Sequence, residues 1–361
     1  MGFLGGLLHG KGAIRVNVDK PYYISGEVIT GNLAVDVLEP IECNGTHTCH
    51  YICRLDTTLV TIGVVLVVTG KEKVYWSENH TETNANGESR SVTRVFADRR
   101  EFFKQKIVLF NVQHSLAPGS YIYPFQYQLP PVLPGCFDNQ SDKGVKAKIE
   151  YSIKGSVDVA GLFSKDLKSR QKLTVYAQLA GVVAPSADQK VQTVRLFCCI
   201  SQGTCSLRAI MDKNMYGPGE TPQIHVDVQN QSSRDVNVMR CELRRHVQAH
   251  ASGKTRNMTK VICHAAFAGV PAGGAVSQPQ PFQLTGTSMY PSTRSALLSC
   301  HYTIDIVCDI ALCPDVELHL PIALGAPTLV PVLTTPPFGT YSQQPTVNQP
   351  PYQGAHASSD V

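Results

Sequence analysis

Two related nine-residue segments decide the fold of this chain. Residues 19–27 read DKPYYISGE and residues 212–220 read DKNMYGPGE, so both follow the pattern D-K-x-x-Y-x-x-G-E. The glycine near the end of each segment, Gly26 or Gly219, permits the backbone angles of a tight turn that residues with a Cβ atom resist. The segment PFQ also occurs once in each half, at residues 124–126 and 281–283, in the same order relative to the turns. This repeated order predicts a duplication, and therefore two domains of one fold.

Around these turns the sequence alternates between apolar and polar residues with the period of a β-strand. Such alternation gives a strand one face for the core and one face for water, as antiparallel sandwiches require. Helical periodicity is almost absent, and the alternating segments are bounded by Gly, Pro and Asn. The clearest alternation lies in residues 13–18, 31–37, 146–153, 223–228 and 302–307. The pattern predicts an all-β chain with two tandem immunoglobulin-like β-sandwiches.

Length and composition agree with two globular domains. The chain has 361 residues, and at about 100–200 residues per domain this length suggests two. Hydrophobic residues make up 43% of the chain and charged residues 17%, and the formal net charge of +4 is too small to indicate nucleic-acid binding by itself. No apolar run approaches the roughly 20 residues of a membrane-spanning helix. Composition therefore excludes a transmembrane protein, a collagen and a wholly disordered chain.

We expect an N-terminal sandwich over residues 1–182, a C-terminal sandwich over residues 183–323, and a disordered Pro-rich tail over residues 324–361. The first boundary falls in the small-residue stretch 181–187. The last 41 residues hold eight of the 23 prolines, a single acidic residue, Asp360, and neither Lys nor Arg. A segment of this composition cannot bury a core of its own.

Several motifs resemble the arrestin superfamily and, within it, the α-arrestins, or arrestin domain-containing proteins. The resemblance spans about residues 11–323. The motifs that carry it are residues 23–31 (YISGEVITG), 70–78 (GKEKVYWSE, with the single Trp), 118–134 (PGSYIYPFQYQLPPVLP), 149–151 (IEY), the pair Cys198-Cys199, 216–220 (YGPGE) and 228–233 (VQNQSS). The resemblance implies the arrestin fold, with two sandwiches in tandem, and an adaptor that is not an enzyme and uses no cofactor.

Residues 45–62 interrupt the spacing that is usual in this family. A Pro-Ile pair such as Pro40-Ile41 normally runs almost directly into a segment such as residues 63–70 (GVVLVVTG). Deleting residues 45–62 would join Asn44 to Gly63 and restore an unbroken strand pattern. We interpret the segment as a surface insertion or as a gene-model artefact such as a retained intron, and expect it to be poorly ordered.

The tail carries a degenerate copy of the Pro-Pro-x-Tyr motif that many α-arrestins present to WW domains of HECT-class ubiquitin ligases. Such motifs bind because their polyproline geometry exists before docking. The candidate WW-binding residues are Pro350, Pro351 and Tyr352, and Gln349 stands where the first proline of the motif belongs. The alternative is a tail that only solvates the protein.

Two clusters of basic residues are candidate sites for phosphate groups or anionic lipid headgroups, which arrestin-like surfaces often bind. The first comprises Lys165, Lys168, Arg170 and Lys172, and the second comprises Arg244, Arg245, Lys254 and Arg256. A basic side chain close to an anionic membrane contributes about 1 kcal/mol of binding free energy. The alternative is that both clusters are ordinary solvated sheet faces.

The sequence gives little support for catalysis or for a metal centre. It contains no nucleophile elbow, no phosphate-binding loop and no carboxylates paired at helical spacing. His47, Cys49, His50 and Cys53 are of types that bind metals, but they lack the Cys-x-x-Cys spacing of zinc knuckles. We therefore expect no enzyme, no metal and no cofactor.

Residues 1–10 have no basic segment and too short an apolar stretch for a secretory signal, so we expect a cytosolic protein whose twelve cysteines are thiols. Five Asn-x-Ser/Thr sequons point the other way, to a secreted adhesion sandwich with glycans and disulfides.

The favoured hypothesis is a cytosolic adaptor that acts peripherally at the plasma membrane or endosomes. It would bind the cytoplasmic tails of membrane proteins, contact anionic membranes, and link its cargo to ubiquitin ligases or sorting machinery. Open sheet edges give a physical basis for binding extended peptides. The alternative within the same structural class is a subunit of an endosomal coat, like the arrestin-fold member of retromer. Nucleic acid is not an expected partner.

Overall fold

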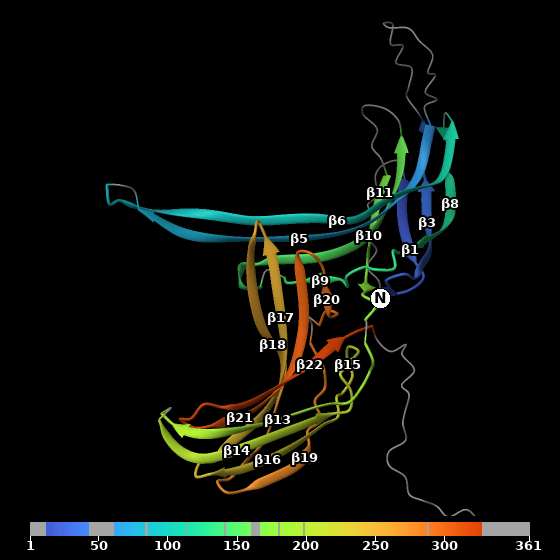
Figure 1. Ribbon diagram of the computed structural model, residues 1–361. Helices are drawn as coiled ribbons and strands as arrows, with labels where there is room; N and C mark the ends of the chain where they lie inside the picture. Colours follow the sequence, from blue (N-terminus) through green and yellow to red (C-terminus); the bar gives the residue numbers. More distant parts are fainter. Residues whose placement is uncertain are drawn as a thin grey trace, which may run out of the picture. The chain divides into compact units, whose positions relative to one another are not determined.

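The computed structural model describes residues 12–42, 61–83, 86–113, 115–140, 142–159, 167–179, 181–197, 199–286 and 289–326. Most of these residues lie in β-strands, and the one helical element among them is a short 3₁₀ turn, Asp142–Gly144 (Figure 1). By their contacts they belong to one compact unit within Met1–Pro327. The prediction of an all-β chain is confirmed.

The N-terminal half is a sandwich of two antiparallel sheets. One sheet has the order β1-β3-β8, and the other has the order β11-β10-β5-β6, with β9 added beside β10. Two short pairs, the antiparallel β4-β7 and the parallel β2-β12, complete this half. The strands are β1 Gly12–Val18, β2 Tyr23–Ile24, β3 Val28–Val37, β4 Ile41–Glu42, β5 Thr61–Thr83, β6 Ser89–Gln113, β7 Ser115–Leu116, β8 Gly119–Gln128, β9 Phe137–Asp138, β10 Lys146–Val159, β11 Leu167–Leu173 and β12 Val175–Tyr176.

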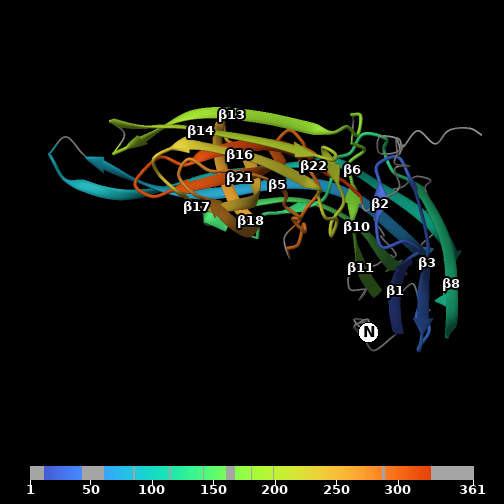
Figure 2. The ribbon, with the colours of Figure 1, turned by 90° about the horizontal axis from the view of Figure 1, so that it is seen from below.

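The C-terminal half repeats this plan. One sheet has the order β13-β14-β16-β19, and β13, β14 and β16 lie side by side in Figure 2. The other sheet has the order β15-β22-β21-β17-β18, with β20 beside β21. The strands are β13 Ser186–Leu196, β14 Ile200–Met211, β15 Met215–Tyr216, β16 Ile224–Ser232, β17 Val236–Ala251, β18 Lys254–Val270, β19 Ala275–Pro279, β20 Thr293–Arg294, β21 Leu298–Ile310 and β22 Val316–Leu324.

The alternation of the sequence places the core between the two sheets of each sandwich. In β3, Leu33 and Val35 are fully buried while Asp36 between Val35 and Val37 is exposed. The single Trp76 is 1% exposed, stacks on Phe96 with ring centroids 5.3 Å apart, and is the largest buried side chain. Full burial of one such apolar side chain contributes about 1.5–3 kcal/mol, so the long alternating strands carry most of the stability.

The two D-K-x-x-Y-x-x-G-E segments form matching turns. The φ angle is 85° at Gly26 and 84° at Gly219, in the region that favours glycine. Tyr23 and Tyr216 are 1% and 2% exposed, so each tyrosine anchors its turn from below. Each lysine forms an ion pair with the glutamate of its own turn, Lys20 with Glu27 at 3.5 Å and Lys213 with Glu220 at 2.5 Å. The sequence repeat is therefore a structural repeat.

Strands β5 and β6, 23 and 25 residues long, continue past the N-terminal sandwich as a two-stranded ribbon (Figure 1). The β17–β18 hairpin of the C-terminal sandwich reaches this ribbon at its turn, where the Ser252 amide donates to Asp98 Oδ2 at 2.6 Å. Lys254 and Arg256 contact Glu78 of the ribbon at 2.5 and 3.4 Å. The ribbon thus connects the two sandwiches through polar contacts.

Two of the expected boundaries shift by a few residues. Ile62 is fully buried in β5 and pairs with Val112, so the end of the suspected insertion belongs to the sandwich. Residues 45–60 of that segment lie outside the described residues. At the other end, β22 runs through Leu324, which is 1% exposed and pairs with Tyr216, so the C-terminal sandwich extends past residue 323. The tail from residue 327 onward is outside the described residues.

Candidate functional site

The first basic cluster lies on the outer face of the β11-β10-β5-β6 sheet. Lys168, Arg170 and Lys172 alternate along β11 and are exposed, so they project from one face of the sheet, while Leu167 and Leu173 point into the core. Lys165 lies outside the described residues. The structure therefore places three of the four predicted residues together on one surface.

Strand register adds basic residues that sequence reasoning missed. Lys172 is in register with Ser152 of β10, Thr69 of β5 and Lys104 of β6. The next row contains Arg170, Lys154, Val67 and Lys106. Directly paired residues of antiparallel strands project to the same side, so Lys104, Lys106 and Lys154 belong to the same face. We call Lys104, Lys106, Lys154, Lys168, Arg170 and Lys172 the basic face.

The basic face is about 15 Å wide, because its rows cross three strand spacings of about 4.8 Å. Its length along β11 is similar: the four residue steps from Lys168 to Lys172, at about 3.3 Å each, span about 13 Å. Along one strand, and between β11 and β10, neighbouring charges lie within about one Debye length, which is about 8 Å at physiological ionic strength, so their potentials add. Lys104 and Lys106 on β6 lie two strand spacings, about 10 Å, from Lys154, so their contribution is more strongly screened. An extended peptide of four or five residues matches this area.

Acidic neighbours neutralise only part of the basic face. Arg170 forms an ion pair with Glu150 at 2.9 Å, and Lys106 with Asp158 at 3.6 Å. Burial would raise the pKa of Glu150, but hydrogen bonds from Lys148 and Lys71 outweigh burial and lower this pKa to about 2. Glu150 is thus ionised and already occupied by three cations. Among the described residues, Lys104, Lys154 and Lys172 have no ion-pair partner and are available to an anion.

The second basic cluster does not form a surface patch. Arg245 is 2% exposed, lies 5.6 Å from the ring centre of Phe137, and donates to Asn139 Oδ1 at 3.4 Å. It therefore cannot reach a lipid headgroup, and its inclusion in the cluster was wrong. It faces the core because it alternates with Arg244 along β17, and the run of basic residues concealed that alternation.

The other three residues of the second cluster are paired with carboxylates. Arg244 contacts Glu242 at 2.9 Å and the buried Asp305 at 3.1 Å. Lys254 and Arg256 share Glu78 of the β5–β6 ribbon. These residues stabilise the fold and the contact between the sandwiches, so the N-terminal basic face is the better candidate site.

The remaining candidates give no second site. Pro350, Pro351 and Tyr352 lie outside the described residues, as do His47, Cys49, His50 and Cys53. Within the described part of the chain no group of three His, Cys, Asp or Glu side chains could hold a metal ion. Nor is any helix there long and apolar enough to cross a membrane.

The cysteines of the described residues are free thiols: Cys136, Cys199, Cys205, Cys241, Cys263, Cys300, Cys308 and Cys313. Burial raises the pKa of Cys136 to about 11 and those of Cys241, Cys300 and Cys308 to about 12. Thiols with such pKa values are poor nucleophiles at neutral pH. These free thiols disagree with the disulfides that a secreted adhesion sandwich would carry.

Comparison with known proteins matches the two sandwiches to two families. The N-terminal half matches the family described as Arrestin (or S-antigen), N-terminal domain, over residues 13–180, and the C-terminal half matches Arrestin (or S-antigen), C-terminal domain, over residues 201–329. The chain belongs to the arrestin superfamily. Within it, the chain is an α-arrestin, a member of the arrestin domain-containing proteins.

Three of the similar proteins are arrestin domain-containing proteins of Dictyostelium discoideum, Bos taurus and Caenorhabditis elegans. Arrestin domain-containing protein A of Dictyostelium discoideum is 26% identical over 363 residues, which cover 98% of this chain and 58% of that protein. Arrestin domain-containing protein 5 of Bos taurus is 26% identical over 208 residues, covering 57% of this chain and 60% of that protein. Arrestin domain-containing protein 17 of Caenorhabditis elegans is 24% identical over 332 residues, covering 85% and 70% respectively. This chain thus spans less than two thirds of the first two relatives.

Proposed function

We propose that this chain is an adaptor whose basic face binds acidic cytoplasmic tails of membrane proteins. The observation that carries the proposal is the set of unpaired lysines on one sheet face, Lys104, Lys154 and Lys172, within a chain of net charge only +4. Membership of a family of adaptors supports it. No described residue suggests that this chain makes or breaks a covalent bond in its partner.

Electrostatics explain why an acidic peptide suits this surface. A single exposed ion pair contributes about 0.2–1 kcal/mol, so no one lysine holds a ligand. Several lysines on a rigid sheet act together, because the sheet fixes their spacing before the ligand arrives. We therefore expect binding that is moderate in affinity, fast in association and strongly weakened by salt.

The test uses the full chain and an acidic peptide with four glutamates in a row. We expect the triple variant Lys104→Glu, Lys154→Glu, Lys172→Glu to weaken binding at least about tenfold, because three attractions become repulsions. The matched control is Lys190→Glu together with Arg195→Glu, two exposed positions on β13 in the other sandwich. Equal loss in the control, or no loss in the triple variant, would reject the basic face as the peptide site. Binding to anionic vesicles but not to the peptide would assign the same face to a membrane instead.

We further propose that Pro350, Pro351 and Tyr352 link the bound cargo to a WW-domain ubiquitin ligase. A peptide of residues 345–357 titrated with a panel of WW domains tests this link, and Tyr352→Ala is the matched control peptide. Dissociation constants of about 10⁻⁴ M or lower that are lost in the control would support it. Equal binding by both peptides, or none below about millimolar, would end it. A location in the cytoplasm, peripherally at the plasma membrane or endosomes, follows from the same proposal.

A further inference from the structure

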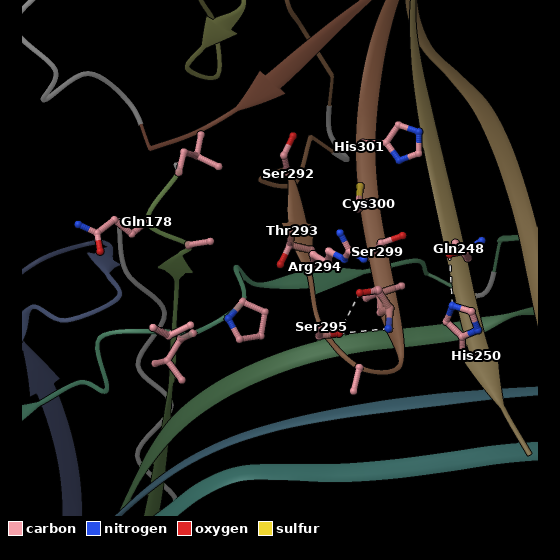
Figure 3. Close-up of a pocket in the computed structure, with 17 residues that line it drawn as sticks. Gln178, Gln248, His250, Ser292, Thr293, Arg294, Ser295, Ser299, Cys300 and His301 are labelled. Atoms are coloured by element: carbon pink, nitrogen blue, oxygen red, sulfur yellow. Dashed lines mark hydrogen bonds between the residues drawn. The ribbon is translucent and has the colours of Figure 1, made fainter. Parts of the chain in front are cut away.

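A pocket of about 740 Å³ lies beside β20 and β21, where the C-terminal sandwich meets the N-terminal half (Figure 3). Its C-terminal wall consists of residues from β17, β20 and β21 and the turn between β20 and β21. Its other wall consists of Val132, Leu133 and Pro134, and of Ala177–Leu179 after β12. The volume falls within the range of about 300–1,000 Å³ that is usual for sites of small molecules.

The side chains of five lining residues have no hydrogen-bond partner among the described residues. Two of them are the amide of Gln178 and the buried hydroxyl of Thr293. The other three are the guanidinium of Arg294, the hydroxyl of Ser299 and the ring nitrogens of His301. Arg294 is directly opposite Ser299 in the β20–β21 pair, and His301 lies two residues further along β21, so all three belong to one face of the sheet. In Figure 3 Arg294 and Ser299 lie close together in the middle of the pocket wall.

The other polar groups of the pocket are already engaged. The Gln248 amide donates to Asn257 Oδ1 at 3.1 Å, and its Oε1 forms a hydrogen bond with His250 Nε2 at 3.2 Å. The other ring nitrogen of His250 forms a hydrogen bond with the Thr255 hydroxyl at 2.7 Å. Ser295 donates to Glu72 at 2.5 Å. Besides Gln178 on the opposite wall and the buried Thr293 hydroxyl, the available hydrogen-bonding groups are therefore those of Arg294, Ser299 and His301.

The charge of the pocket favours an anion. None of its lining residues is Asp or Glu, whereas Arg294 carries a permanent positive charge. The carboxylate of Glu72 approaches from behind Ser295, where its Oε2 accepts from the Ser295 hydroxyl at 2.5 Å and the Leu297 amide at 3.4 Å. It is fully buried, so it does not line the pocket.

The opposite wall is apolar except for Gln178. Val132 is 89% exposed, and Leu133, Pro134 and Leu179 continue the same wall. An isolated apolar side chain on a protein surface is common. Here four apolar side chains face a cluster of hydrogen-bond donors without partners, which suits a ligand that has one apolar part and one polar part.

We propose that this pocket binds a small organic anion, whose phosphate or carboxylate group is held by Arg294, Ser299 and His301 while its apolar body packs on Val132, Leu133, Pro134 and Leu179. Arg294 supplies a planar pair of donors that matches the oxygens of either group. Because the ligand contacts both halves of the chain, its binding stabilises their contact by mass action. This site is separate from the basic face and does not depend on it.

The test is a titration of the full chain with phenyl phosphate by isothermal calorimetry. Phenylacetate distinguishes a carboxylate from a phosphate ligand, and phenyl glucoside provides the same ring without charge. We expect saturable binding of at least one anion and none of the glucoside. Arg294→Gln should weaken anion binding at least about tenfold, because it removes a charge-assisted hydrogen bond. His301→Gln should weaken it about threefold, because the variant loses one hydrogen bond of ordinary strength.

The matched control is Arg195→Gln, an exposed arginine of β13 that is distant in the sheet order from β20 and β21. It should leave anion binding unchanged, and thermal unfolding without ligand should show that Arg294→Gln folds as the wild type does. Absence of saturable binding, equal binding of the glucoside, or equal affinity in Arg294→Gln would each overturn the proposal. The acidic peptide used for the basic face should bind Arg294→Gln normally, so the two proposals fail independently.

Discussion

The β11-β10-β5-β6 sheet of the N-terminal sandwich and the β22-β21-β17-β18 sheet of the C-terminal sandwich occupy equivalent places in the duplicated fold, but their outer faces carry charge differently. The N-terminal face has lysines without partners. On the C-terminal face, Arg240 pairs with Asp309 at 2.7 Å and Arg244 with Asp305 at 3.1 Å. The comparison teaches that the two halves share a backbone plan while the N-terminal face leaves several lysines unpaired and the C-terminal face pairs the arginines of β17 with its own carboxylates.

The C-terminal face also carries histidines where the N-terminal face has lysines. His246 and His301 stack across β17 and β21 with ring centroids 4.9 Å apart, and His319 contacts Asp305 at 3.0 Å. Histidine changes its charge near neutral pH and lysine does not. The two faces should therefore respond differently to mutation and to pH.

The largest expected effect follows from Asp305→Ala. The Asp305 side chain is 1% exposed and pairs with Arg244 and His319, so its removal leaves the partly buried Arg244 guanidinium with Glu242 as its one remaining ion-pair partner in the described part of the chain and opens a cavity at the Asp305 site. We expect the free energy of unfolding to fall by about 2–4 kcal/mol in urea denaturation. Lys172→Ala on the N-terminal face should change it by less than about 0.5 kcal/mol. If both variants lost a similar free energy of unfolding, charged residues would contribute equally to stability on the two faces, which would contradict the comparison.

Acid should act on the N-terminal face through Glu150. Its folded pKa of about 2 lies below the unfolded value of about 4.3, so the stabilisation is present above pH 4.3 and is lost as pH falls toward 2. In Glu150→Gln, the free energy of unfolding should fall by about 2 kcal/mol less than in the wild type between pH 5 and the acid end of the range. Denaturation midpoints measured between pH 5 and pH 2.5 should therefore converge for the two proteins at the acid end. Parallel curves would contradict the assigned role of Lys71 and Lys148.

The matching turns should respond alike even though the faces do not. Gly26→Ala and Gly219→Ala each place a Cβ atom at a φ near 85°, and neither new Cβ meets another atom closer than 3.5 Å. The expected cost is therefore the backbone strain alone, about 1–2 kcal/mol in each case. Thermal unfolding of both variants checks this, and a difference above about 1 kcal/mol would show that the two turns are not equivalent.

The smallest effect is expected for His246→Gln. Burial and, after it, the neighbouring His301 lower the pKa of His246; Asp305 opposes this by a smaller amount, and Arg244 and His319 lower the pKa further. A folded pKa below the unfolded value means that His246 weakens the fold as pH falls through about 6.5, the unfolded value. The wild type should thus lose more stability than His246→Gln between pH 7.5 and pH 5.5. An identical pH dependence in the two proteins would remove His246 as the cause.

The sequence predicted the all-β class, the duplication, the turns and the family because these are encoded locally. Alternation with a period of two fixes which residues of a strand can face the core, and a glycine at a tight turn is visible in the chain itself. The same local reading found Lys168, Arg170 and Lys172, which alternate along one strand. It also misplaced Arg245, because a run of basic residues does not reveal which of them faces inward.

The tertiary structure alone decided which charges meet. Lys104, Lys154 and Lys172 lie on three different strands and share a face only because β11, β10, β5 and β6 pair in that order and register. Arg294 and His301 become neighbours of Val132 only when the two halves pack together. Register and domain contact depend on the summed packing of the whole molecule rather than on any one segment, so the sequence determines the kind of surface available and the fold determines where its parts converge.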